Sequence, residues 1–95
     1  MKKVYLFVEI SVRPGQTDAF IERLKKHAEL VRAEKGCEVL EIFRDTQDES
    51  RVCVWEIWSD RPSWDAHMVI DHSKAWQKEA PQYVFGEKIT VMESA

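Results

Sequence analysis

Two of the three histidines of this chain lie close together in the segment WDAHMVIDH, which runs from Trp64 to His72. Imidazole titrates near neutral pH, so His67 and His72 are well suited to take up or release a proton. Trp64 and His67 are three residues apart, and a helix here would place both on nearly one face. On a continuous helix, His72 would lie about 140° around the axis from His67. The two imidazoles can therefore serve one site only if the helix breaks near Asp71.

Each of these histidines also has a purely structural interpretation. His67 could be a helix residue bonded to a backbone carbonyl, and His72 a capping or surface residue. His27 lies beside two lysines in another helical segment, and we expect it to be structural. A metal site would need three or four ligands converging at about 2 Å. The histidine spacing matches no compact metal motif such as HExxH, so we expect no metal.

The surrounding sequence predicts the elements that would position this segment. Segments rich in β-branched and aromatic residues predict strands, and these are residues 4–12, 37–44, 51–58 and 84–93. Residues 17–35 carry apolar side chains at helical spacing, with Thr17 as a candidate cap and Gly36 as a candidate end.

A second helical segment opens at Ser59 or Asp60, has Pro62 in its first turn and stops at Pro81. The resulting order is βαββαβ, which predicts an α+β, ferredoxin-like fold. In this fold a four-stranded antiparallel sheet carries two helices on one face. We expect one domain over residues 1–95.

Alternation along the strands divides the sheet residues between two faces. To the helix-covered face we assign Leu6, Val8, Ile10, Leu40, Ile42, Cys53, Trp55 and Ile57. To the opposite face we assign Tyr5, Phe7, Glu9, Val39, Glu41, Phe43, Val54, Glu56 and Trp58. The criterion is that glutamates lie away from the core. The second set is too apolar to leave in water and too charged for a sealed core. We expect a second copy of the chain to cover it, the alternative being an unusually apolar monomer surface.

Composition narrows the functional class. The chain has 95 residues, of which 44% are hydrophobic and 33% charged, with a formal net charge of −3. Lysine and arginine are scattered, which argues against nucleic acid. The longest apolar run is far short of the roughly 20 residues of a membrane helix, and no export signal is evident, so we expect a cytoplasmic protein. Cys37 and Cys53 are expected to be reduced thiols on opposite sheet faces, a disulfide being the alternative.

The segments EKGC, RVCVWEIWSDRPSWDAH and DHSKAW, with VEISVRPGQ near the start, resemble the antibiotic biosynthesis monooxygenase (ABM) family. That family belongs to the dimeric α/β-barrel superfamily. It includes small quinol monooxygenases and the enzyme that processes phosphorylated autoinducer-2. The resemblance implies a homodimer whose sheets pack face to face, with a small-molecule pocket between sheet and helices. Gln77 and Val8 stand where the superfamily's haem-degrading branch has a histidine and an asparagine, which argues against haem.

We therefore predict a monooxygenase that needs no cofactor and oxidises a small phenolic or quinol-type substrate with molecular oxygen. Without GxGxxG, a P-loop or a metal motif, the redox chemistry would come from the substrate. The predicted catalytic residues are His67 and His72. The predicted pocket residues are Val8, Trp55, Ile57, Trp64 and Met68. The alternatives are an isomerase of a small hydroxy-ketone, and a non-enzymatic dimeric module for ligand binding or stress response.

Overall fold

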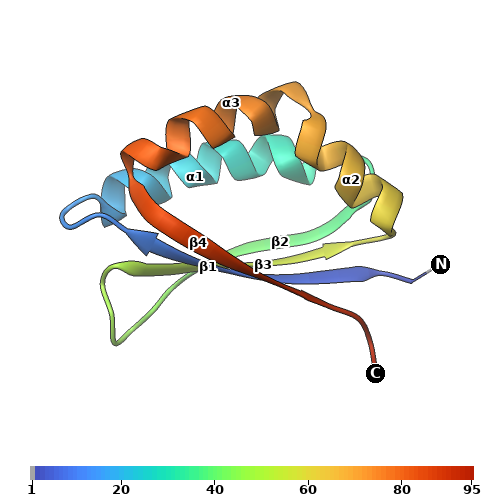
Figure 1. Cartoon of the computed structure of the whole chain (residues 1–95), viewed down its shortest axis with the longest axis horizontal. Helices are drawn as coiled ribbons and strands as arrows, with labels where there is room; N and C mark the ends of the chain where they lie inside the picture. Colours follow the sequence, from blue (N-terminus) through green and yellow to red (C-terminus); the bar gives the residue numbers. More distant parts are fainter. Residues whose placement is uncertain (1) are drawn as a thin grey trace.

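The computed structural model describes residues 2–95 and has all four strands in one antiparallel sheet. The elements are β1 (Val4–Val12), α1 (Thr17–Arg32), β2 (Cys37–Arg44), β3 (Arg51–Trp58), α2 (Arg61–Val69), α3 (Asp71–Glu79), η1 (Ala80–Gln82) and β4 (Val84–Met92). The strand order is β2-β3-β1-β4, and the helices cover one face of the sheet (Figure 1). The chain thus has the predicted α+β, ferredoxin-like architecture. None of the described helices is long and apolar enough to cross a membrane.

Helix α1 packs on the sheet through one apolar face. Its buried side chains are Phe20, Ile21, Leu24, His27, Ala28 and Val31, at the spacing of a single helix stripe. The helix starts at Thr17 as predicted, but Thr17 does not cap it, because its hydroxyl donates to the carbonyl of Glu49. It ends at Arg32, three residues before the predicted end. Gly36 follows with φ 89°, a conformation that side-chain-bearing residues rarely adopt.

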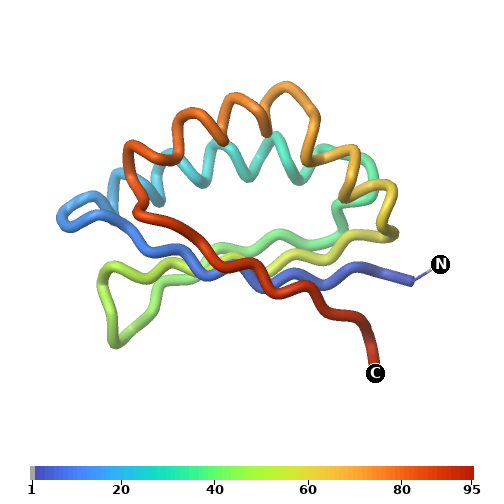
Figure 2. Tube along the Cα trace, viewed as in Figure 1, coloured from blue at the N-terminus to red at the C-terminus, as the bar shows by residue number. Residues whose placement is uncertain are grey.

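The second helical segment is broken into α2 and α3. Asp60 caps α2, since its carboxylate accepts from the backbone N–H of Ser63 at 2.8 Å. Ile70 has φ −70° and ψ 152°, which is extended backbone, so it separates the two helices. The break lies one residue before Asp71, the position at which the sequence analysis requires it. Figure 2 shows the chain changing direction here, with α3 then running beside α1.

The predicted face assignment of β3 is wrong, whereas those of β1 and β2 beyond Cys37 are confirmed. In the antiparallel register, Leu6 pairs with Glu56 and Val8 pairs with Val54. Paired residues point to the same side of the sheet, so Val54 and Glu56 lie on the helix-covered side. Trp58 shares this side and is fully buried. The error came from requiring every strand glutamate to point away from the core. Glu56 can lie on the inner side because it lines a cavity there.

The other side of β3 carries Cys53, Trp55 and Ile57. Trp55 packs against Tyr5, with ring centroids 6.2 Å apart. The expected positions of the cysteines are also exchanged. A register shift between Cys37 and Val39 pairs Cys37 with Trp58 and turns it toward the core. Both cysteines are free and remain on opposite faces.

Candidate functional site

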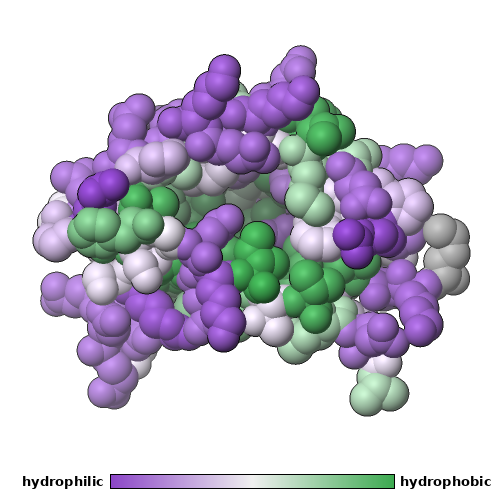
Figure 3. All heavy atoms as spheres, in the orientation of Figure 1, coloured by the Kyte–Doolittle hydropathy of each residue, from purple (hydrophilic) through white to green (hydrophobic). Residues whose placement is uncertain are grey.

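A cavity of about 250 Å³ lies between the sheet and the helices. Strands β1, β2 and β3 form its floor, α1, α2 and α3 enclose it, and β4 forms its rim. Figure 3 shows the surface hollowed between the helices and β4, with hydrophobic side chains beside the hollow. Most of the lining is apolar. The polar side chains that reach it are His27, Glu56, His67, Ser73, Gln77 and Glu87.

Some of the predicted pocket residues meet at this cavity. Val8, Trp64 and Met68 line it together with His67. Trp55 and Ile57 do not, because they lie on the opposite face of the sheet. Their placement in the pocket was therefore wrong, and Glu56 and Val54 occupy the corresponding positions on the cavity floor.

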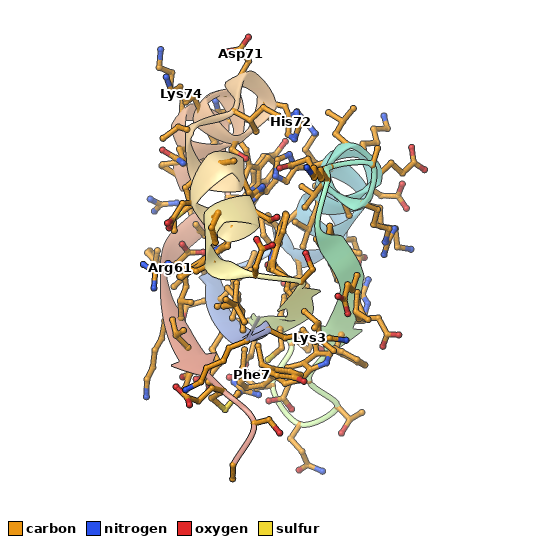
Figure 4. The ribbon with its side chains drawn as sticks, turned by 90° about the vertical axis from the view of Figure 1, so that its right-hand side faces the viewer. Lys3, Phe7, Arg61, Asp71, His72 and Lys74 are labelled. Carbon is orange, nitrogen blue, oxygen red and sulfur yellow. The ribbon has the colours of Figure 1, made fainter. Side chains whose placement is uncertain are left out.

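His67 and His72 converge on a residue that the sequence analysis did not identify, Glu34. The Glu34 carboxylate is 7% exposed and follows the end of α1. Its Oε2 lies 2.9 Å from Nδ1 of His67 and 2.6 Å from Nε2 of His72. The break at Ile70 makes this convergence possible. Figure 4 shows His72 on the side of α3 toward α1, whereas Asp71 and Lys74 point outward.

The hydrogen bonds to Glu34 determine the arrangement of protons on His67. An ionised carboxylate only accepts hydrogen bonds, so Nδ1 of His67 must carry the hydrogen that it shares with Glu34. Ser73 Oγ lies 3.2 Å from the same nitrogen. All hydrogen bonds that the side chain of His67 makes within residues 2–95 involve Nδ1. In the neutral ring, Nε2 therefore keeps a lone pair that can accept a proton from a ligand.

The ring of His67 is held from the sheet side by Trp58. The two ring centroids are 4.8 Å apart. The indole N–H of Trp58 in turn donates to Oε1 of Glu56 at 2.9 Å. Burial raises the pKa of the Glu56 carboxyl, and the hydrogen bond from Trp58 and the nearby His67 oppose this rise. The i, i+2 spacing of Glu56 and Trp58 on one strand was the sequence signal for this pair, since such residues share a face.

His27 forms part of the cavity wall. It is 7% exposed and stacks on Trp76, with ring centroids 4.8 Å apart and an interplanar angle of 12°. Its pKa is lowered to about 4, mainly by burial and then, in decreasing order, by the neighbouring His72, His67 and Arg23. At neutral pH the ring is therefore uncharged. It acts as an aromatic wall and carries no positive charge.

Glu34, His67 and His72 are also the described residues that could together hold a metal ion. One ligand atom from each lies within 4.8 Å of the others. The same three groups are already joined by hydrogen bonds of 2.6 and 2.9 Å. Two histidines and one glutamate are also the protein ligands of some catalytic zinc sites, which leave a fourth position to water. The contacts between these three residues are those of a carboxylate that accepts from two imidazoles, and the same side chains form a set that could hold a metal ion.

Comparisons with known proteins agree with this fold. The family model described as antibiotic biosynthesis monooxygenase matches residues 3–79. A structure from Pseudomonas aeruginosa has a TM-score of 0.91 at 21% identity, covering 100% of this chain and 96% of that chain. A structure of an antibiotic biosynthesis monooxygenase has a TM-score of 0.88 at 18% identity, covering 97% and 98%.

A curated relative is the Mus musculus protein named N-terminal EF-hand calcium-binding protein 1. It is 26% identical over 82 residues, which cover 86% of this chain and 23% of the mouse protein. The chain therefore spans about a quarter of the length of the curated relatives that it matches.

Proposed function

Because the chain belongs to the antibiotic biosynthesis monooxygenase family, we propose that it is a monooxygenase that acts without a cofactor on a small phenolic or quinol-type substrate. The observation that carries this proposal is the orientation of His67. Its Nδ1 is hydrogen-bonded to the carboxylate of Glu34, which is 7% exposed, and its free Nε2 belongs to a ring that lines a mostly apolar cavity. A carboxylate that fixes the tautomer of a histidine is the arrangement of a general base.

In the proposed reaction, Nε2 of His67 accepts the proton of a ring hydroxyl. The ring anion gives one electron to molecular oxygen, and the resulting ring radical and superoxide combine to form a carbon–oxygen bond. Cleavage of the oxygen–oxygen bond releases water and leaves a quinone carbonyl. One oxygen atom enters the product and the other becomes water, and the ring supplies the electrons. An apolar cavity favours this sequence by keeping bulk water from the intermediates.

The remaining predicted site residues have different proposed roles. Val8, Trp64 and Met68 would pack against the substrate ring, because all three line the cavity. His72 is hydrogen-bonded to Glu34 at 2.6 Å and does not line the cavity. We therefore assign His72 the role of holding Glu34, with no direct contact to the substrate.

We also propose that the protein acts as a homodimer formed through the uncovered face of the sheet. That face carries Tyr5, Phe7, Phe43 and Trp55, of which Phe43 is 46% exposed. Large apolar side chains on one face favour burial against a second copy of the same surface. Partner and cavity lie on opposite sides of the sheet, so dimerisation would leave the substrate site accessible.

Isomerisation of a small hydroxy-ketone is the second candidate function. It is favoured by one observation, which is that Glu56 and His67 face one cavity from the floor and from the helices. Two proton-transfer groups on opposite sides of a ligand can move a proton between adjacent carbons. This reaction consumes no oxygen, so the two functions can be distinguished directly. A binding module without activity would show neither reaction.

Oxygen uptake tests the proposal. Purified protein is assayed with a panel of phenols and quinols, with ¹⁸O₂ to follow the oxygen atom into the product. The His67→Ala variant should be slower by about 10²–10⁴-fold, the usual contribution of a general base. Asp71→Ala, on the outward side of α3, is the matched control and should retain full activity. A His67→Ala protein as fast as its parent would show that the histidine is structural.

A further inference from the structure

The cavity that contains His67 carries acidic side chains and no basic amino acid of permanent charge. Among the described residues, its lining includes Glu56 and Glu87 but no lysine and no arginine. Pockets that bind phosphates or carboxylates ordinarily supply the permanent positive charge of arginine or lysine. The lining of this cavity therefore has the wrong charge for an anionic ligand.

Glu56 offers an acceptor atom to the cavity. Its Oε1 accepts the indole N–H of Trp58 at 2.9 Å, and Oε2 has no protein partner among residues 2–95. No partnerless side-chain oxygen is sealed from solvent in the described part of the chain. Since Glu56 lines the cavity, Oε2 is open to it and can accept a hydrogen bond from a ligand. A hydrogen bond to a charged carboxylate is stronger than one between neutral groups.

Two arginines that contact residues of the cavity lining are directed elsewhere. Arg23 is paired with Glu79 at 2.7 Å and lies over the ring of Trp76. Arg32 donates to the carbonyl of Leu40 from two of its nitrogens. His27 is on the cavity wall, but burial keeps it neutral at pH 7. None of these groups offsets the negative charge of Glu56 toward a ligand.

We infer that Glu56 sets the charge selectivity of the cavity, so that anionic rings are rejected in favour of neutral, hydroxyl-bearing rings of the same size. The inference rests on the proposed function only in taking this cavity as the substrate site. A volume of about 250 Å³ suits one or two fused rings, because pockets for drug-sized ligands begin at roughly 300 Å³. A phosphorylated hydroxy-ketone is disfavoured by the same charge.

Equilibrium binding of two matched rings tests the inference. The probes are 2-naphthol, which is neutral at pH 7, and 2-naphthoate, which is an anion of nearly the same shape. Isothermal titration calorimetry under nitrogen keeps oxidation out of the measurement. Unmodified protein should bind 2-naphthol at least about tenfold more tightly than 2-naphthoate, because the naphthoate would place its negative charge beside that of Glu56. Equal affinities, or no binding of either ring, would overturn the inference.

The variant Glu56→Gln removes the charge and keeps the shape. Glu56→Gln should reduce the ratio between the affinities for 2-naphthol and 2-naphthoate by at least about tenfold, mostly because 2-naphthoate binds more tightly. Glu29→Gln makes the same change on the exposed side of α1 and should alter nothing. If the Glu56→Gln protein has the same affinity ratio as the parent, Glu56 does not determine the charge selectivity.

Glu56→Asp is a second variant, for use if Glu56→Gln does not fold. Because it retains the charge, it should keep rejecting 2-naphthoate while losing affinity for 2-naphthol. Acceptance of 2-naphthoate by this variant would contradict the inference. A protein that discriminates in this way yet consumes no oxygen would refute the proposed monooxygenase and leave the selectivity intact.

Discussion

Glu34 and His67 are 33 positions apart in the sequence, yet Oε2 of the first lies 2.9 Å from Nδ1 of the second. Two backbone features bring them together. Gly36, with φ 89°, turns the chain two residues after Glu34, and the extended Ile70 ends α2 after His67. The carboxylate is almost fully shielded from solvent. This contact is the basis for assigning the free lone pair of His67 to Nε2.

Replacing Glu34 by glutamine should impair catalysis with little change in KM. An amide can donate as well as accept, so it no longer fixes which nitrogen of His67 carries the hydrogen. Loss of the correct tautomer is expected to lower kcat by up to about 10⁴-fold, as in hydrolase triads. KM should hold because Glu34 does not line the cavity. Steady-state oxygen uptake gives both constants.

Two further variants make the Glu34 measurement specific. Glu34→Asp keeps the charge and should recover part of the lost rate. Glu38→Gln changes an exposed glutamate four residues away, which pairs with Lys3, and should leave kcat unaltered. A rise in KM at constant kcat would indicate that Glu34 supports the shape of the cavity and not the base.

His27 should make the protein less stable in acid. Its pKa is about 4 when folded, against 6.5 for an unperturbed imidazole. Between these values the unfolded chain binds more protons than the folded one, so stability falls as the pH decreases. The loss should reach about 3 kcal/mol by pH 4. His27→Phe keeps the stacking on Trp76 and cannot titrate. Urea unfolding of both proteins from pH 7 to pH 4 should show a smaller loss of unfolding free energy for the variant. An equal dependence on pH in the two proteins would show that His27 does not cause the acid sensitivity.

The sequence was sufficient for the elements and their order, because strand composition and helix spacing are local properties. The four strands were placed to within one residue, and the break between α2 and α3 lies one residue from the position that the sequence analysis left as a condition. The inner face of β3 was not predictable by the rule that glutamates avoid the core. That rule holds for a sealed core, but Glu56 lies beside a cavity and is bonded to Trp58.

Glu34 could not be recognised from the sequence for a different reason. It stands in the segment AEKG, where a glutamate ordinarily faces solvent after a helix. Its role depends on α2 and α3, which are more than 25 residues further along the chain. The convergence of His67 and His72 was likewise conditional on a helix break. Only the three-dimensional arrangement shows that both imidazoles meet one carboxylate.

Trp55→Lys should convert the proposed dimer into a folded monomer. Trp55 lies on the uncovered face beside Tyr5, so a charge there would oppose burial against a second copy. Stable interfaces bury roughly 800 Å² per partner, and a central lysine would disrupt such a surface. Sedimentation at micromolar concentration should give twice the chain mass for the parent and the chain mass for the variant. A monomeric parent would refute the dimer.

The last prediction concerns the two glycines with positive φ, which form a matched pair. Gly15 has φ 75° and Gly36 has φ 89°, so alanine at either position would be strained. Such strain costs about 1–2 kcal/mol. A Cβ at Gly15 would meet open space, whereas one at Gly36 would collide with Cβ and Oγ of Ser63 in α2. Overpacking of this kind adds typically 1–3 kcal/mol.

Gly36→Ala should therefore destabilise the protein clearly more than Gly15→Ala does, as measured by urea unfolding at pH 7. The collision also has a functional consequence, because relieving it moves α2 away from the segment that carries Glu34. The hydrogen bond between Glu34 and His67 would lengthen, and oxygen uptake by the Gly36→Ala protein should fall even where the protein is fully folded. Gly15→Ala should lose stability without losing activity. Equal losses of stability in the two variants would mean that α2 shifts freely, and that the position of His67 does not depend on its packing against Gly36.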